Sequence, residues 1–183
     1  MVVVSLRLLS LNPTTVMVVL LLGLRLLLGC DNKLKWLQFQ ILRNSLQTKY
    51  IVSHFKNNVS SLCNFCNEYD ELVSHLFWSC GVVSLFLSEL KAFLLSLNFD
   101  FSPDKAQLLF GFHDLPFTHP SNYIILLCKR YIWVTKFQGC QLSMGRFKYL
   151  LKTVVVDLKI IFSNKGEEYK FTAWEPIENA LAE

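Results

Sequence analysis

The chain has 183 residues, which is enough for one ordinary domain with a sizeable core and too few for a polymerase with fingers, palm and thumb. Apolar residues make up 52% of the sequence and charged residues 17%, a composition that excludes a largely disordered chain. The formal net charge of +4 is modest, so the distribution of the charges is more informative than their sum.

Residues 1–30 differ in character from everything that follows. The runs at 2–4 and 16–28 are nearly all Val and Leu. Three interpretations remain open: a targeting signal with a loosely fitting cleavage pattern, a membrane helix, or an apolar extension unrelated to any domain. A membrane helix needs about 20 apolar residues, and Arg25 leaves only about a dozen before it. A membrane partner is therefore expected only through this segment.

Amphipathic helices begin after residue 31. Leu34, Leu37 and Ile41 recur at spacings of three and four, which predicts a first helix starting near residue 33. A second, short helix is expected over 48–56. These two helices open a domain that we expect to span residues 31–162.

Four residues between positions 63 and 80 have the types and spacing of metal ligands. Cys63 and Cys66 form a Cys-x-x-Cys pair, and His75 and Cys80 supply a second pair. Three thiolates and one imidazole are typical of a structural Zn²⁺ site, and four protein ligands leave no open position for catalysis. We expect these residues to form a zinc knuckle whose ligands, in chain order, are two cysteines, one histidine and one cysteine. We expect no enzymatic activity.

The second ligand pair constrains the local structure. Positions five apart on a continuous α-helix point in different directions, so His75 and Cys80 cannot share one helix. We expect a short helix that begins near Asp70, carries His75 and ends before Cys80. Gly81 is then expected to adopt the left-handed conformation that terminates a helix.

Three cysteines fall outside the knuckle. Cys30, Cys128 and Cys140 lie in apolar or helical surroundings, where a buried free thiol is the ordinary interpretation. A chain of this size with cysteines at metal spacing is not a small disulfide scaffold. We therefore expect a reduced, intracellular setting in the cytoplasm or the nucleus.

Helical periodicity dominates the sequence after the knuckle. The predicted helices cover 82–97, 103–111, 121–138 and 145–162, with a loop over 114–120. Residues 163–183 form a tail that is either a loose extension or a short final helix. The sequence as a whole predicts an all-α fold, with nothing larger than a short hairpin at the metal loop.

Basic residues are concentrated in the last two predicted helices. Between residues 129 and 165 there are eight basic residues against Asp157 alone, which suits a surface for a polyanion. The alternative is that they are the solvated faces of amphipathic helices. The candidate nucleic-acid-binding residues are Lys129, Arg130, Lys136, Arg146, Lys148, Lys152 and Lys159. We expect solvent exposure for Lys136, Arg146, Lys148, Lys152 and Lys159, and inward packing for Leu126, Ile132, Leu150, Val154 and Leu158.

Several of these pieces resemble the zinc-binding domain that follows the reverse transcriptase in the polyproteins of non-LTR, LINE-type retrotransposons. The resemblance runs from about Trp36 to Pro176, and the knuckle is its most specific part. Its other pieces are Trp36 to Leu42, Leu108 to Phe112, and Trp174-Glu175-Pro176. The resemblance implies that Cys63, Cys66, His75 and Cys80 hold Zn²⁺. It also implies that RNA or DNA is the partner and that no small-molecule substrate is bound.

The chain departs from this family in two respects. The aspartate pairs that bind catalytic Mg²⁺ are absent, so polymerase chemistry is not expected, and residues 1–30 match nothing in the family. The chain is then interpreted as the C-terminal piece of an element's polyprotein. Two alternatives remain open: a zinc-braced protein-interaction module, and a non-functional element fragment. Phe65 or Trp78 would either stack on an unpaired base or pack around the zinc.

Overall fold

The computed structural model describes residues 32–112, 114–115 and 119–182, and the expectations for residues 1–30 lie outside these residues. The described part of the chain is helical and contains no strand. Within the described ranges, one isolated antiparallel bridge joins Leu62 to Asp70 in the segment 57–74, which we call the metal loop. The all-α prediction is therefore confirmed.

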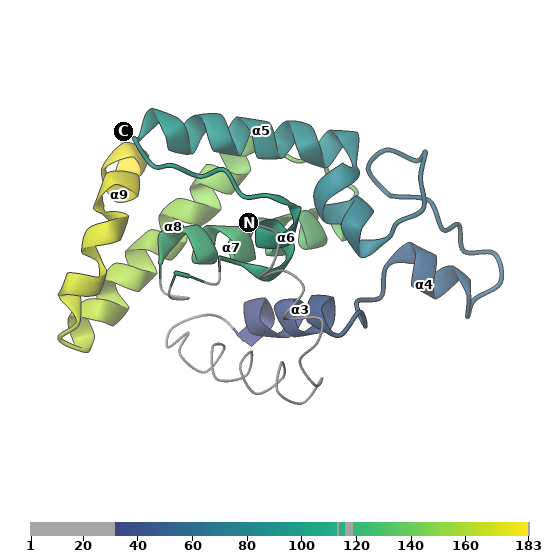
Figure 1. Cartoon of the computed structure of the whole chain (residues 1–183), viewed down its shortest axis with the longest axis horizontal. Helices are drawn as coiled ribbons and strands as arrows, with labels where there is room; N and C mark the ends of the chain where they lie inside the picture. The colour runs from purple at the N-terminus through teal and green to yellow at the C-terminus, as the bar shows by residue number, and fades with distance from the viewer. Residues whose placement is uncertain (1–31, 113, 116–118, 183) are drawn as a thin grey trace.

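Figure 1 shows the described helices, coloured in chain order. They are α3 (Asn32–Leu42), α4 (Lys49–Ser53), η1 (His75–Ser79), α5 (Gly81–Ser96), α6 (Lys105–Phe110), α7 (Pro120–Gln138), α8 (Met144–Asn164), η2 (Glu168–Lys170), η3 (Thr172–Trp174) and α9 (Glu175–Ala182). The last two long helices agree with their predicted ranges to within two residues at each end. None of the described helices is long and apolar enough to cross a membrane.

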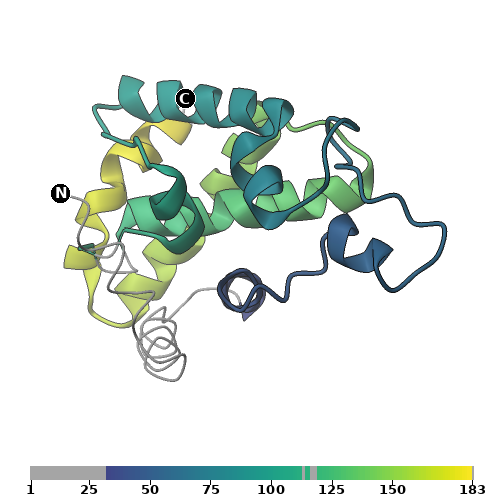
Figure 2. The same cartoon turned by 45° about the vertical axis from the view of Figure 1, so that its right-hand side comes forward.

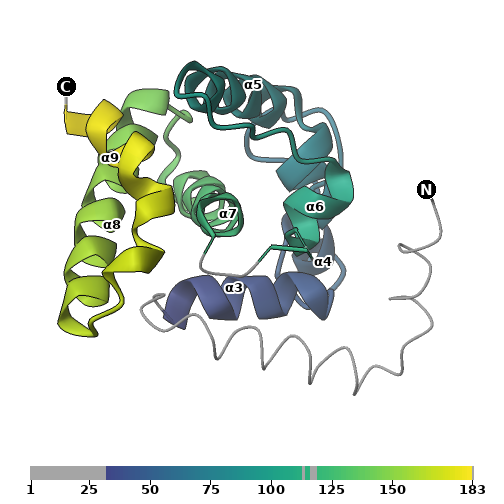
Figure 3. The ribbon, with the colours of Figure 1, turned by 60° about the vertical axis from the view of Figure 1, so that its left-hand side comes forward.

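Helix α7 is the centre of the fold. Figure 3 shows it nearly end-on, with α3, α5, α6 and the pair α8 and α9 arranged around it. Every residue from Ser121 to Lys129 is buried. A helix that is buried on all sides lies inside a core. Side chains of this part of α7 therefore face other helices and not solvent.

The outer helices bury one face each against this centre. On α5, Phe86, Leu90 and Leu94 recur at spacings of four and are buried. On α8, Phe147 and Leu151 follow the same rule, and the Phe147 ring meets the Phe86 ring edge-on at a centroid distance of 5.5 Å. Figure 2 shows the metal loop and α4 at the opposite end of the molecule from α9.

The C-terminal segment packs into the core. Phe171, Trp174 and Ile177 are buried, and α9 lies against α8. The Trp174 ring meets the Tyr123 ring of α7 edge-on, with centroids 5.5 Å apart. Of the two alternatives left open for residues 163–183, the structure shows the short final helix.

Helix α6 begins slightly later than the sequence suggested. Asp104, not Pro103, precedes its first turn and accepts a hydrogen bond from the Gln107 N–H at 2.7 Å. The Gln107 side-chain oxygen accepts a hydrogen bond from the Asp104 N–H in return, so the two residues form a capping box. The helix ends at Gly111 as predicted, with φ of 90°, where an added Cβ would lie 3.0 Å from the Asn122 side chain.

Lys129 of α7 is buried with no carboxylate partner among the described residues. Its ammonium group donates to the Gln38 side-chain oxygen and to the Leu109 carbonyl oxygen, the latter at 2.9 Å. Burial lowers the pKa of Lys129 to about 7 from 10.5. In the unfolded chain this lysine keeps its proton up to about pH 10.5. Above pH 7 the unfolded state therefore binds more protons than the folded state, and stability rises with pH.

We expect the substitution Lys129→Met to abolish this pH dependence. Between about pH 7 and pH 9 the wild-type chain should gain about 2 kcal/mol of unfolding free energy relative to the variant. Urea denaturation at the two pH values measures the difference, and Lys152→Met, at an exposed position of α8, is the control. If the unfolding free energies of wild type and Lys129→Met depended equally on pH, the lowered pKa of the buried Lys129 would be contradicted.

Candidate metal centre

The four candidate ligands converge. The Sγ atoms of Cys63, Cys66 and Cys80 and a ring nitrogen of His75 all lie within 4.8 Å of one another. The Cys63 and Cys80 sulfurs are 3.9 Å apart, and the Cys66 sulfur lies 3.4 Å from His75 Nε2. Cys63, Cys80 and His75 are buried, and Cys66 is half-buried. The cluster has the composition and the closeness needed to hold a metal ion.

The first ligand pair lies on a tight turn. The Asn67 N–H donates to the Cys63 carbonyl oxygen at 2.9 Å, and the Cys63 N–H donates to the Tyr69 carbonyl oxygen at 2.8 Å. Asn67 has φ of 56°, a left-handed conformation that Asn tolerates better than most residues. The Phe65 N–H points at the Cys63 sulfur at 3.5 Å. The turn therefore aims both thiols inward and brings a backbone donor to one of them.

The second ligand pair is aligned by a π-helical turn. The Cys80 N–H donates to the His75 carbonyl oxygen at 2.9 Å, which closes an i to i+5 turn. This wider turn brings positions five apart to the same side of the chain, which an ordinary α-helix does not do. The short helix was predicted to start near Asp70, but the first helical residue is Val73 because Asp70 pairs with Leu62.

The predicted role of Gly81 is wrong. Cys80 is extended, with ψ of 124°, and Gly81 directly opens α5 without a left-handed conformation. The π-turn already ends at Cys80, so no terminating glycine is required. Cys80 thus joins the two helices and presents its thiol to the cluster.

The protonation of the cluster depends on its surroundings. Burial raises the pKa of the Cys63 thiol to about 12. Burial also acts to raise the pKa of the Cys66 thiol, but backbone N–H groups at Glu68 and Tyr69 outweigh this effect and lower it. A divalent cation among these groups would favour the thiolates directly. On the other side of the imidazole, the Ser79 hydroxyl lies 3.4 Å from His75 Nδ1 and can orient the ring.

Two of the predicted nucleic-acid-binding residues are buried. Lys129 and Lys136 lie on one stripe of α7 together with the buried Ile125 and Ile132, at spacings of four, three and four. Because α7 is the central helix, this stripe faces the core. The expected exposure of Lys136 is wrong, and neither lysine can reach a phosphate.

The other five candidates lie nearer the surface. Arg146, Lys152 and Lys159 are exposed as expected, whereas Lys148 is only half-buried, and so is Arg130. The Lys148 ammonium lies 4.1 Å from the centre of the Phe93 ring, and Lys159 pairs with Glu178 at 2.8 Å. Among the residues expected to pack inward, Leu126, Ile132 and Leu158 are buried, and Leu150 and Val154 are half-buried against the core.

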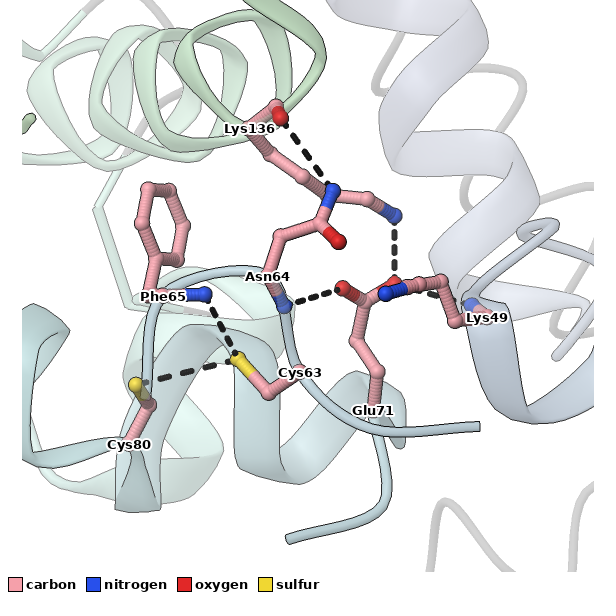
Figure 4. A network of polar contacts seen from close by, with 7 residues as sticks. All are labelled: Lys49, Cys63, Asn64, Phe65, Glu71, Cys80 and Lys136. Carbon is pink, nitrogen blue, oxygen red and sulfur yellow. Dashed lines mark hydrogen bonds and ion pairs between the residues drawn. The ribbon is translucent and has the colours of Figure 1, made fainter. Parts of the chain in front are cut away.

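The polar network beside the knuckle is not apparent from the sequence. Figure 4 shows the Glu71 carboxylate between Lys136, Lys49 and the knuckle residue Asn64. The burial of Lys136 was detectable, because its spacing from Ile125 and Ile132 places it on an apolar stripe. Phe65 and Trp78 are half-buried and pack against the core, which favours the packing alternative for both aromatics.

The fold and the cluster together define a class: an all-α domain in which three cysteines and one histidine can hold a metal ion. Comparison with protein-family models, curated proteins and solved structures finds no match for this chain. The class of this protein is therefore assigned from its own fold and from the geometry of the cysteine and histidine cluster.

Proposed function

We propose that the cluster binds one Zn²⁺ as a structural ion. Thiolates and imidazole are the ligands that zinc prefers, and tetrahedral Zn–S bonds of about 2.3 Å place two sulfurs about 3.8 Å apart. The separation of 3.9 Å between the Cys63 and Cys80 sulfurs fits this requirement. Four protein ligands would complete the coordination, so the ion braces the fold and does not activate a substrate.

We further propose that the domain binds RNA or DNA without sequence preference through one edge of α8. The observation that carries this proposal is the spacing of Lys148, Lys152 and Lys159, which follow one another along a single stripe at intervals of four and seven. Helix α8 carries four basic residues and one acid, Asp157. The resemblance of the knuckle to retrotransposon zinc-binding domains supports the same class of partner.

The triple substitution of Lys148, Lys152 and Lys159 with Gln tests this function. We expect the variant to stay folded and zinc-loaded, because the exposed Lys152 and Lys159 contribute little to stability and the half-buried Lys148 loses one cation–π contact of about 1 kcal/mol. Its affinity for single-stranded RNA should fall at least about tenfold at low salt, and the log–log salt slope should become shallower by about 2 to 3. Filter binding over a salt series measures the RNA affinity and its salt slope, and zinc analysis measures the zinc content of the variant.

A matched triple variant separates position from net charge. Lys56, Lys91 and Lys105 are exposed and belong to other segments of the chain than α8, and their replacement with Gln changes the net charge equally. We expect this control to lose much less affinity. Equal losses in both triple variants would show that only the total charge matters, and no loss in either would show that the α8 lysines are a solvated helix face.

A protein-interaction role is the second candidate, and one observation favours it. Tyr149, Val156 and Ile160 lie on the outer face of α8 at intervals of seven and four, and all three are exposed. An apolar stripe with this spacing is the usual form of a helix that docks into a groove. This candidate becomes the better supported one if the wild-type chain binds RNA no better than the α8 triple variant.

A further inference from the structure

Glu71 is a fully buried carboxylate at the end of the metal loop. It has no exposed surface, which is rare for a glutamate unless its charge is paired. Its counter-ion is Lys136 near the end of α7, whose side chain is also buried. The Lys136 ammonium lies 4.1 Å from the centre of the Trp133 ring, which helps to shield the pair from water.

The same carboxylate accepts two backbone hydrogen bonds from different parts of the chain (Figure 4). The Lys49 N–H, at the start of α4, donates to Oε1 at 2.8 Å. The Asn64 N–H donates to Oε2 at 3.3 Å. The Asn64 side chain in turn donates to the Lys136 carbonyl oxygen at 3.2 Å. One buried group therefore ties together the metal loop, α4 and α7.

Asn64 connects this network to the metal ligands. It follows Cys63 directly and precedes Cys66 by two residues, so the position of its backbone sets the direction of both thiols. Most other side chains of the turn are exposed and offer little packing; these are Asn64, Asn67, Glu68, Tyr69 and Asp70. Apart from Phe65, which packs against the core, the turn is therefore held mainly by hydrogen bonds and, in the proposed site, by the metal.

Helix α4 depends on the same anchor. None of its five residues is buried, and its cap residue Thr48 makes no side-chain hydrogen bond to it. The Lys49 N–H is one of the donors that a helix start leaves without an internal partner, and Glu71 supplies the acceptor. The placement of α4 should then follow the placement of Glu71.

We propose that Glu71 is a positioning residue of the metal centre, and that it couples metal binding to the docking of α4 against the metal loop. The inference rests on the proposed metal site. Metal binding fixes the turn that carries Asn64, and the fixed turn holds the Glu71 carboxylate between Lys136 and Lys49. By thermodynamic reciprocity, loss of the carboxylate weakens metal binding as much as loss of the metal weakens the anchor of α4.

The substitution Glu71→Gln in the full chain tests the coupling. The amide keeps the shape of the side chain but removes the charge that pairs with Lys136, and its NH2 group cannot accept a hydrogen bond from either N–H group. We expect zinc affinity, measured by competition with a chromophoric chelator, to fall about 10- to 100-fold with unchanged stoichiometry, as is typical for groups that orient metal ligands. The control is Glu178→Gln, which removes the carboxylate of the exposed pair with Lys159 and should leave zinc affinity unchanged.

Hydrogen exchange of the wild-type chain gives a second, variant-free measurement. The Lys49 amide should be protected with zinc bound and should exchange faster after chelation, whereas the Leu151 amide in the middle of α8 should stay protected in both states. A purely structural role of Glu71 would leave the zinc affinity of the folded variant unchanged. Equal zinc affinity of Glu71→Gln and wild type, or equal Lys49 exchange with and without zinc, overturns the coupling alone. A wild-type chain that binds no zinc overturns the proposed metal site and the coupling with it.

Discussion

Replacement of Cys80 with Ser is expected to lower zinc affinity a few hundredfold. Structural zinc sites contribute about 10–16 kcal/mol of apparent binding free energy, so an equal share for one of four ligands is about 2.5–4 kcal/mol. Serine keeps the size of the side chain but offers a hydroxyl in place of a thiolate. Because Cys80 also joins the π-turn to α5, the variant should lose order around η1 as well.

Competition titration with a chelator measures the affinity, and the absorption of bound Co²⁺ reports whether the remaining ligands still form a tetrahedral site. Cys140→Ser is the matched control, because Cys140 is half-buried, lies outside the cluster and should leave the titration unchanged. If Cys80→Ser bound zinc as tightly as the control, Cys80 would not be a ligand, and the proposed site would have only three protein ligands.

Replacement of Trp174 with Ala should destabilise the chain by about 3–5 kcal/mol, because it empties a fully buried site. The loss would show in a urea titration as a lower midpoint with little change in slope. The expectation follows from the place of Trp174 between the C-terminal segment and the Tyr123 ring of the central helix. A segment that only extended from the domain would not carry such a cost.

Two further substitutions sharpen this test. The Trp174 Nε1 group is buried and has no hydrogen-bond partner among the described residues. Trp174→Phe keeps an aromatic ring and removes that unpaired donor, so it should cost only about 1 kcal/mol. Trp36 on α3 is 60% exposed, and Trp36→Ala should therefore change stability by no more than about 0.5 kcal/mol. A cost for Trp174→Ala as small as that for Trp36→Ala would show that the C-terminal segment does not belong to the core.

Together, the two sets of variants would separate the contributions of the two ends of the molecule. The metal loop has few buried side chains and depends on coordination and on Glu71, whereas the opposite end depends on apolar packing of α8 against α7 and of α9 against α8. Chelation should therefore disturb η1 and α4 first and leave the long helices protected. Substitution of Trp174 should instead lower the stability of the whole domain.

Much of the molecule was predictable from local sequence pattern. The spacing of Cys63, Cys66, His75 and Cys80 identified the metal cluster, because all four residues lie within one short segment whose turns are set by near neighbours. The apolar period of about 3.6 identified the long helices, because each helix forms its hydrogen bonds within itself. Both signals are contained in short stretches of the chain.

Other features were decided only by the tertiary structure. Lys129 and Lys136 were predicted as basic residues of a nucleic-acid-binding surface, but α7 is enclosed by the surrounding helices and both lysines are buried. The roles of Glu71 and Trp174 likewise depend on partners far away in the chain, Lys136 and Tyr123. Charge and residue type do not reveal such partners. Burial is set by which helices meet in space, and that meeting depends on the packing of the whole chain, not on the neighbours of any one residue.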